Sequence, residues 1–261
     1  MRTALIGHSG FVGGNLAAQT AFDDCYNSKN IEDLAGRSYD LLICSGAPAA
    51  KWIANKNPEQ DWENLSRLIG ALDQVEAKSV VLISTVDVYA KPLEVNESDT
   101  GYAALEDGAY GFHRRRLETF VQERFSDATV IRLPGLFGQG LKKNVIYDFL
   151  NDNCLDMIHP GGVFQFYNLE YLWSDIQKVR EAGIRVINFA VEPTSVREIA
   201  QECFGFTFEN NKMTGPGARY DFRTLHSAPW GRTDGYLYGK DQVKADITRF
   251  VQTQREVAAC N

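Results

Sequence analysis

The clearest indication of the fold of this 261-residue chain is the stretch Thr3-Ala4-Leu5-Ile6-Gly7-His8-Ser9-Gly10-Phe11-Val12-Gly13. A short, mostly apolar strand runs directly into a turn in which every third residue is glycine. Glycines permit a tight strand-to-helix turn and let the backbone approach a pyrophosphate, which the N–H groups of the helix N-terminus then bind. We therefore predict a dinucleotide site here, although a glycine-rich turn without a ligand is the alternative. The predicted contacts are Gly7, Ser9, Gly10, Phe11, Val12 and Gly13.

Apolar segments alternate with segments of helical period through the first half of the chain. Residues 39–44, 79–83 and 128–132 are predicted strands, and 61–75 and 110–125 are predicted helices. This alternation implies right-handed crossovers and an α/β fold with a Rossmann-like, doubly wound parallel sheet. Only fifteen positions separate Asp24 from Tyr39, too few for a strand, a helix and another strand. One βα unit is therefore expected to be missing.

The sequence pattern changes after about residue 140, where aromatic, glycine and polar residues alternate without a sustained hydrophobic period. Two clearer segments are a predicted strand at 186–189 and a helix at 195–203, with Ser195 as its cap. We predict a Rossmann domain over residues 1–140 and a smaller substrate lobe over residues 141–261, with elements that return to the sheet.

Composition and charge disfavour several classes of function. The chain has 27 Lys and Arg against 34 Asp and Glu, a net charge of −7, which gives no long-range attraction for nucleic acid or anionic lipid. Five dispersed cysteines and four dispersed histidines indicate neither a disulfide scaffold nor a metal site. No apolar run has the length of a membrane helix, so we expect a cytoplasmic protein.

The end of the predicted second strand bears on the type of cofactor. The segment Asn27-Ser28-Lys29-Asn30 has no acidic residue to hold the ribose of an adenosine. The hydroxyl of Ser28 and the ammonium of Lys29 could instead bind a ribose 2′-phosphate, which favours NADP slightly over NAD. A solvated turn is the alternative, so both nucleotides stay open.

Hydroxyl and cationic side chains form the candidate proton-transfer site. Ser84 and Thr85 end a predicted strand, at the sheet edge where α/β proteins present ligands. Tyr110 and Arg114 lie four residues apart and share a helix face. A cation beside a phenol favours the phenolate, so this set could move a proton while hydride passes to or from a nicotinamide.

These motifs, in this order, resemble the extended short-chain dehydrogenase/reductase superfamily, in its epimerase/dehydratase branch. The resemblance runs from Met1 to about Phe250 and implies that Thr85, Tyr110 and Arg114 are catalytic, with Ser84 beside them. It also implies cofactor contacts from Ser45, Gly46, Ala47, Asn64, Tyr110, Arg114, Pro134 and Gly135. The expected function is that of an NAD(P)-dependent oxidoreductase or epimerase acting on a sugar nucleotide or a related hydroxyl or carbonyl compound.

Two departures from the family pattern are clear. The family's Tyr-x-x-x-Lys is Tyr110-x-x-x-Arg114 here, which keeps the positive charge in a bulkier side chain. Dehydratases of the branch carry two acids after the catalytic threonine, whereas this chain has Val86 and then Asp87. Dehydration needs an acid and a base, so we do not expect it.

Three further residues are candidate substrate contacts, each with a plainer alternative. Asp87 could be a local structural residue, Arg132 an ordinary strand-end residue, and Arg223 part of a solvated loop. The alternative function is an NAD(P)-binding sensor that has lost catalysis, which the lysine-to-arginine change favours. An enzyme acting on small carbonyl compounds is a third possibility, and a homodimer is also possible.

Overall fold

The computed structural model describes residues 1–259, so Cys260, one of the five cysteines, lies outside the described residues. The chain forms two compact units. The first unit comprises Met1–Lys91, Glu97–Leu133 and Glu170–Asn188, and the second comprises Pro92–Asn96, Pro134–Leu169 and the chain from Phe189 onward. Both units are therefore assembled from separated stretches of sequence.

The first unit is built on a six-stranded parallel sheet of order β2-β1-β3-β4-β5-β9. These strands are β1 (Thr3–Ile6), β2 (Asp24–Tyr26), β3 (Ser38–Cys44), β4 (Glu76–Thr85), β5 (Ala128–Leu133) and β9 (Val186–Asn188). The central strands are continuous apolar runs because both faces of the sheet are covered. The predicted Rossmann-like α/β fold is confirmed.

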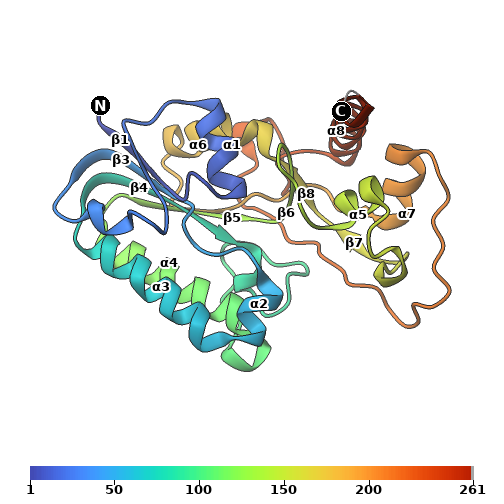
Figure 1. The fold of residues 1–261 in the computed structure, drawn as a ribbon, viewed down its shortest axis with the longest axis horizontal. Coiled ribbons are helices and arrows are strands. Elements are labelled where there is room, and N and C mark those ends of the chain that lie inside the picture. The colour runs from blue at the N-terminus through green and yellow to red at the C-terminus, as the bar shows by residue number, and fades with distance from the viewer. Residues whose placement is uncertain (260–261) are drawn as a thin grey trace. The chain divides into compact units, whose positions relative to one another are not determined.

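Helices cover the two faces of this sheet (Figure 1). Helices α1 (Phe11–Gln19) and α6 (Leu172–Glu181) lie on one face and contact each other. On the other face, α3 (Pro58–Asp73) and α4 (Ala109–Arg124) lie side by side, with the short α2 (Lys51–Lys56) contacting both. Leucines and valines at helical spacing on α3 and α4 pack against β3, β4 and β5 and form the core of this layer.

The sheet is shortened at its β2 edge, as the short spacing there predicts. A four-residue 3₁₀ turn, η1 (Ile31–Leu34), stands where a full helix would connect β2 to the next strand, and β3 pairs directly with β1. Strands β2 and β3 thus lie on opposite sides of β1 in the sheet, so the strand order reverses at β1. Such a switch point opens a crevice at the carboxyl ends of the strands, where open α/β sheets bind ligands.

The second unit consists of short elements. Strand β6 (Gly135–Phe137) pairs in parallel with β8 (Phe166–Asn168), and β7 (Val163–Phe164) pairs with β10 (Thr194–Ser195). Its helices are α5 (Val145–Asn151), α7 (Val196–Glu198), the π-helix η6 (Ile199–Phe204) and α8 (Lys240–Ala259). Ser195 caps α7 through a reciprocal capping box with Glu198, which confirms the predicted cap.

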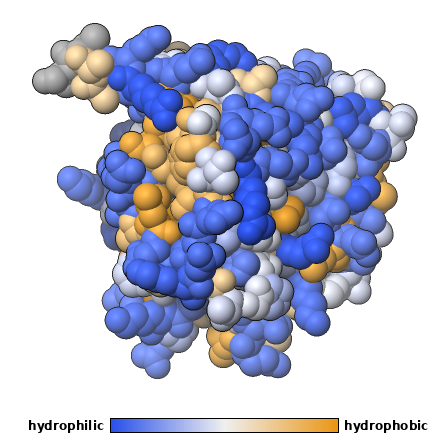
Figure 2. Space-filling model, turned by 90° about the vertical axis from the view of Figure 1, so that its right-hand side faces the viewer, coloured by the Kyte–Doolittle hydropathy of each residue, from blue (hydrophilic) through white to orange (hydrophobic). Residues whose placement is uncertain are grey.

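The face shown in Figure 2 is mostly hydrophilic, and its most extended hydrophobic area lies at the upper left. Within the second unit, Phe149, Phe204, Phe206 and Phe208 form a cluster of edge-to-face rings. No helix in the described part of the chain is both long and apolar enough to cross a membrane. Cys25, Cys44, Cys154 and Cys203 are free thiols.

Candidate active site

The glycine turn after β1 is closely packed against the turn after β3. Gly7 has a φ of +90°, and a Cβ there would lie 2.5 Å from the carbonyl oxygen of Ser45. A Cβ on Gly13 would lie well inside contact distance of the Gly7 carbonyl oxygen. Both positions therefore require glycine, because a side chain would separate the strand, the helix and the neighbouring turn.

A pair of adjacent substitutions tests this packing. Gly13→Ala is expected to lower the free energy of unfolding by about 1–3 kcal/mol, because the new methyl group would overlap the backbone carbonyl of Gly7 and the Ser45 Oγ. Gly14→Ala is the matched control: its Cβ would lie an ordinary 3.6 Å from the His8 carbonyl oxygen, on an exposed helix position. It should stabilise the chain by up to about 1 kcal/mol. Equal unfolding free energies in urea for the two variants would contradict the predicted packing.

The N-terminus of α1 opens from this turn with the features of an anion site. Gly10 caps the helix without a side-chain hydrogen bond, and the first turn holds no acidic residue. Ser9 and Gly10 are exposed, and Phe11 and Val12 are half-buried. The backbone N–H groups and the positive end of the helix dipole are therefore available for a phosphate group.

The end of β2 is organised by Asn27. Its side-chain amide lies 3.1 Å from His8 Nε2, and its Oδ1 accepts a 2.9 Å hydrogen bond from the Lys29 N–H. Asn30 Oδ1 in turn accepts from the Asn27 N–H. Ser28 and Lys29 are exposed on this ordered turn, next to the glycine turn that His8 belongs to. An amide thus stands where a nucleotide-binding acid would be expected.

The turn after β3 is fixed to β1. The N–H and the hydroxyl of Ser45 both donate 2.9 Å hydrogen bonds to the carbonyl oxygen of Ile6. Gly46 is needed for packing, since a Cβ there would lie 2.8 Å from the Ile6 side chain, and Ala47 is packed against the core. The predicted residues Ser45 and Gly46 therefore pack against Gly7, and Ala47 follows them in the same turn.

Tyr110 lies in the first turn of α4 and is buried. Its N–H donates to Asn55 Oδ1 at 2.9 Å, and its phenol forms a side-chain hydrogen bond with Thr85. Gly111 lets the helix approach the Asp87 carbonyl oxygen. Burial, the largest cause, raises the pKa of Tyr110 above its ordinary value near 10, although Arg114 opposes this shift. The structure thus brings together Tyr110 and Thr85, as predicted.

Arg114 contacts Tyr110 through the face of the aromatic ring. Its Cζ lies 4.0 Å from the ring centroid, and its Nη1 donates to the Tyr110 carbonyl oxygen at 3.4 Å. Its Nη2 donates at 2.5 Å to the carbonyl oxygen of Pro48, in the turn that follows β3. The buried Nε has no hydrogen-bond partner among the described residues. The Nε–H is therefore a donor of the guanidinium that the described residues do not use.

Asp61 is a site residue that the sequence did not indicate. Its Oδ2 accepts hydrogen bonds from Arg114 Nη1 and, at 2.9 Å, from His113 Nδ1. All three side chains are at least 94% buried. The predicted cofactor contact on the same helix, Asn64, is instead exposed and lies outside this cluster. The only signal for Asp61 in the sequence is its position on the helix: it lies on the same buried face of α3 as Leu65, Leu68 and Leu72.

Ser84 and Arg132 belong to a second buried network. Ser84 donates a 2.6 Å hydrogen bond to Glu118 Oε1, and Arg132 donates through Nε and Nη2 to the same carboxylate. Arg132 Nη1 donates to the Tyr89 hydroxyl at 2.7 Å. Thr85 instead lies against Tyr110 in the first turn of α4, while Ser84 bonds to Glu118 further along the same helix. The Arg132 guanidinium is thus bound within the protein, which favours the structural alternative over substrate contact.

Asp87 lies next to the candidate proton-transfer residues Thr85 and Tyr110. Its N–H donates to Thr85 Oγ1 at 3.1 Å, and its carboxylate forms a 2.8 Å ion pair with Lys51 of α2. Asp87 raises the pKa of Tyr110 and Lys51 lowers it, so both charges act on the phenol. Lys51 is a second residue that sequence reasoning missed. It is half-exposed, and it sits at the first position of α2.

The other predicted residues lie in the second unit. Gly135 begins β6, where a Cβ would lie 2.9 Å from the Gln165 carbonyl oxygen, and the preceding Pro134 is half-buried. Arg223 is paired with Asp221 at 3.2 Å and lies over the Tyr236 ring. Their part in ligand binding stays a prediction.

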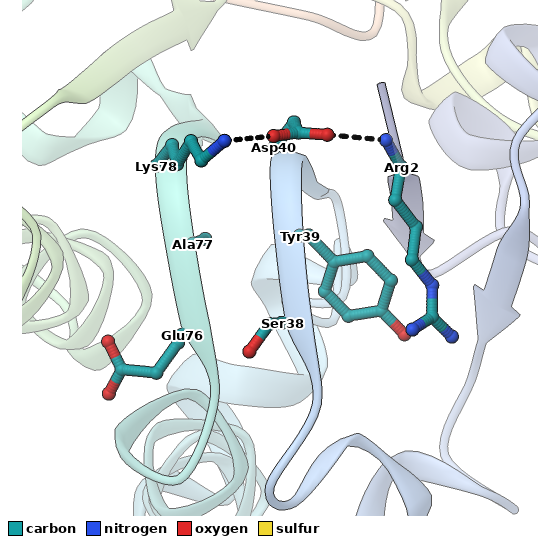
Figure 3. A pocket seen from close by; sticks show the side chains of 7 residues that line it. All are labelled: Arg2, Ser38, Tyr39, Asp40, Glu76, Ala77 and Lys78. Atoms are coloured by element: carbon teal, nitrogen blue, oxygen red, sulfur yellow. Dashed lines mark hydrogen bonds and ion pairs between the residues drawn. The ribbon is translucent and has the colours of Figure 1, made fainter.

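A pocket of about 410 Å³ lies at the opposite ends of the strands, where β3 and β4 begin (Figure 3). Asp40 bridges Lys78, at 2.6 Å, and the backbone N–H of Arg2. These charges satisfy one another, and the pocket is on the edge of the sheet away from the glycine turn. Among residues 1–259, no cluster of three or more His, Cys, Asp or Glu side chains could hold a metal ion.

The sequence matches no family model and no curated protein, so the comparisons with solved structures carry the evidence. The fold is similar to dTDP-4-dehydrorhamnose reductase from Yersinia enterocolitica (TM-score 0.72, 13% identity, 97% of this chain and 99% of that chain). It is also similar to the Bacillus anthracis reductase in complex with NADP (0.71, 16%, 95% and 96%). A third similar structure is UDP-glucose 4-epimerase from Thermotoga maritima with UDP-glucose (0.69, 13%, 99% and 100%).

All three solved structures share the fold of this chain over nearly their whole lengths. The predicted resemblance is therefore confirmed at the level of the fold. Because the sequence identities are low, this agreement concerns the fold and not the individual site residues.

Proposed function

We propose that this protein is an NAD(P)-dependent oxidoreductase or epimerase that acts on a nucleotide-linked sugar, with Tyr110 as the proton-transfer residue. A single set of contacts supports this proposal. Gly7 touches Ser45, the same turn offers the Pro48 carbonyl to Arg114, and Arg114 covers the ring of Tyr110. The candidate phosphate turn and the candidate acid–base residue are thus joined through these three contacts within one unit.

The residues of the first unit fit a nicotinamide dinucleotide. The glycine turn and the N-terminus of α1 would hold its pyrophosphate, and the free Nε–H of Arg114 would donate to a ribose hydroxyl. Ser28 and Lys29, with no acid at the end of β2, favour a 2′-phosphate and therefore NADP. When bound, the nicotinamide would supply or accept hydride.

The substrate class rests on the structural neighbours, whose names include dTDP-4-dehydrorhamnose reductase and UDP-glucose 4-epimerase. Thr85 would hydrogen-bond the reacting oxygen of the sugar while Tyr110 exchanges a proton with it. Asp87 is the proposed polar contact to the rest of the substrate within the first unit, and a role for Arg223 of the second unit stays a prediction. A homodimer stays a prediction.

The test is consumption of NADPH, followed by its near-ultraviolet absorbance, with dTDP-4-dehydrorhamnose and a set of other nucleotide-linked keto sugars. NADH is offered in parallel, and UDP-glucose is tested for epimerisation. We expect tighter binding of NADPH than of NADH, and turnover of at least one sugar. Binding of neither nucleotide would refute the proposal.

A sensor that binds NAD(P) without catalysis is the second candidate. Asp61 favours it, because this carboxylate offsets the charge of Arg114 that would activate Tyr110. NADPH binding together with inactivity towards every sugar tested would support the sensor. Turnover of one sugar would exclude it.

A further inference from the structure

The imidazole of His8 joins the glycine turn to the turn that follows β2. Its Nε2 lies 3.1 Å from the side-chain amide nitrogen of Asn27, the first residue after β2. A backbone hydrogen bond holds the same two turns together, since the Gly7 N–H donates to the Tyr26 carbonyl oxygen at 2.7 Å. His8 and Asn27 are both half-buried. The contact between them therefore lies at the carboxyl ends of β1 and β2.

The hydrogen bonds of the Asn27 turn decide which way its amide faces. The Lys29 N–H donates to Asn27 Oδ1 at 2.9 Å, so this oxygen is turned toward the backbone. The Asn27 N–H donates to Asn30 Oδ1, which orders the turn further. The amide nitrogen of Asn27 must then face His8, and an amide nitrogen only donates. His8 Nε2 is therefore the acceptor, and the ring is neutral, with its proton on Nδ1.

Three donors on these turns have no hydrogen-bond or ion-pair partner among residues 1–259. They are the Nδ1–H of His8, the hydroxyl of Ser28 and the ammonium of Lys29. The acid that precedes them on β2, Asp24, is paired with Arg2 at 2.8 Å. Unused donors that include a cation, on a turn without an acid, suit an anionic group.

We propose that His8 and Asn27 form a proton-linked switch that selects NADP over NAD, because binding of the 2′-phosphate takes up a proton on His8. The inference rests on the proposed function and adds a regulation to it. Asn27 lies about twenty residues after Gly7, at the position where an acid binds the ribose 2′-hydroxyl of NAD. A phosphate bound beside an imidazole favours the imidazolium form.

Protonation of His8 changes the hydrogen bonds of the Asn27 turn. A proton from water adds to Nε2, which then donates and no longer accepts from the amide nitrogen. The Asn27 amide turns over, so that its Oδ1 accepts from His8 and releases the Lys29 N–H. That N–H and the Nδ1–H of His8 are then both available to the phosphate, as charge-assisted hydrogen bonds.

The surrounding charges keep His8 neutral until an anion binds. Lys29 already places a positive charge on the turn, so a second one on His8 is unfavourable without the phosphate. The glycine turn and the first turn of α1 hold no acid that would offset it. The other titratable groups on the elements that meet here are Asp24, Cys25 and Tyr26 of β2 and Glu32 and Asp33 of η1. Of these acids, Asp24 and Glu32 are paired with arginines.

The first measurement is the tautomer of His8 in the full chain without added nucleotide. The imidazole nitrogens are observed by long-range ¹H–¹⁵N correlation at about pH 8, above the ordinary range of histidine titration. The chain has four histidines, and the signals of His8 are those that the His8→Gln variant lacks. We expect the proton on Nδ1. A proton on Nε2 would overturn the inference.

The second measurement compares the binding of NADP⁺ and NAD⁺ by isothermal titration calorimetry. At about pH 6 the preference for NADP⁺ is expected to be about tenfold greater than at about pH 8, the effect of one charge-assisted hydrogen bond. His8→Gln keeps an acceptor for Asn27 but does not titrate. Its preference should not rise at the lower pH, where the 2′-phosphate itself loses charge. Between these pH values, buffers of different ionisation enthalpy should show proton uptake with NADP⁺ that His8→Gln lacks.

Two further variants complete the comparison. His226→Gln removes an imidazole from the second unit and should show the pH dependence of the wild type. Asn27→Asp should reverse the preference toward NAD⁺, because a carboxylate accepts from the ribose 2′-hydroxyl and repels a 2′-phosphate.

The outcomes separate this inference from the proposed function. A preference for NADP⁺ that does not change with pH, or that rises equally in His8→Gln, would overturn the switch and leave the proposed function standing. Binding of neither nucleotide would refute the proposed function, and the switch with it.

Discussion

Tyr110→Phe is expected to lower the turnover of the keto sugar by about three orders of magnitude, within the range that one acid–base group contributes. The substitution removes a single oxygen atom from a buried side chain, while the stacking of Arg114 on the ring is retained. The contacts between the glycine turn and Ser45 do not involve the phenol. NADPH affinity should therefore change little, and this separation of turnover from binding is the readout.

Tyr147→Phe provides the matched control. It also removes one phenolic hydroxyl, but from α5 in the second unit, and it should leave turnover close to that of the wild type. Both variants are compared by NADPH consumption and by titration of NADPH fluorescence. A Tyr110→Phe variant that keeps a tenth or more of the wild-type turnover would remove Tyr110 from the proposed mechanism.

The fold could be predicted because its signals are local. The strand that ends at Ile6 and the helix that follows Gly10 are neighbours in sequence, and the apolar runs of β3, β4 and β5 are continuous. The shortened β2 edge follows from counting residues before Tyr39. These features depend on periodicity and chain length, which a single sequence contains in full.

The site was predicted less completely because its electrostatics depend on distant partners. Asp61 meets His113 and Arg114 across more than fifty positions, where α3 and α4 pack together. In the sequence, Asp61 is simply an acid in the first turn of a helix, where acids are common. The exposed Asn64 matched a family position, but the register of the helix turns a different residue inward.

The network around Arg132 shows the same difficulty at shorter range. The sequence places this arginine at the end of a strand, which is compatible with either a substrate contact or a structural residue. Its partner Glu118 lies only fourteen positions earlier, but on a helix that reaches Arg132 only after packing on the sheet. The different partners of Ser84 and Thr85 lie at different positions along α4, and these contacts form only once the helix has packed beside the strand end.

Glu118→Gln is expected to lower the free energy of unfolding by about 3–5 kcal/mol, because it leaves the Arg132 guanidinium charged and buried without its counter-ion. Glu118 interacts at once with Arg132, Ser84 and, at 3.1 Å, Arg115. An arginine side chain is not deprotonated in proteins, so Arg132 keeps its charge when the carboxylate of its partner is removed. The measurement is urea-induced unfolding at neutral pH.

Two comparisons distinguish a buried charge from the general loss of an ion pair. Glu76→Gln breaks the exposed pair with Arg124 and should cost no more than about 1 kcal/mol. The double variant Glu118→Leu/Arg132→Met removes both buried charges and should recover most of the stability lost in Glu118→Gln. Ser84 lies opposite Arg132 in the sheet and directly precedes Thr85. Loss of this network would therefore also loosen the end of β4 that carries Thr85. Equal costs for Glu118→Gln and Glu76→Gln would show that the buried carboxylate does not neutralise Arg132.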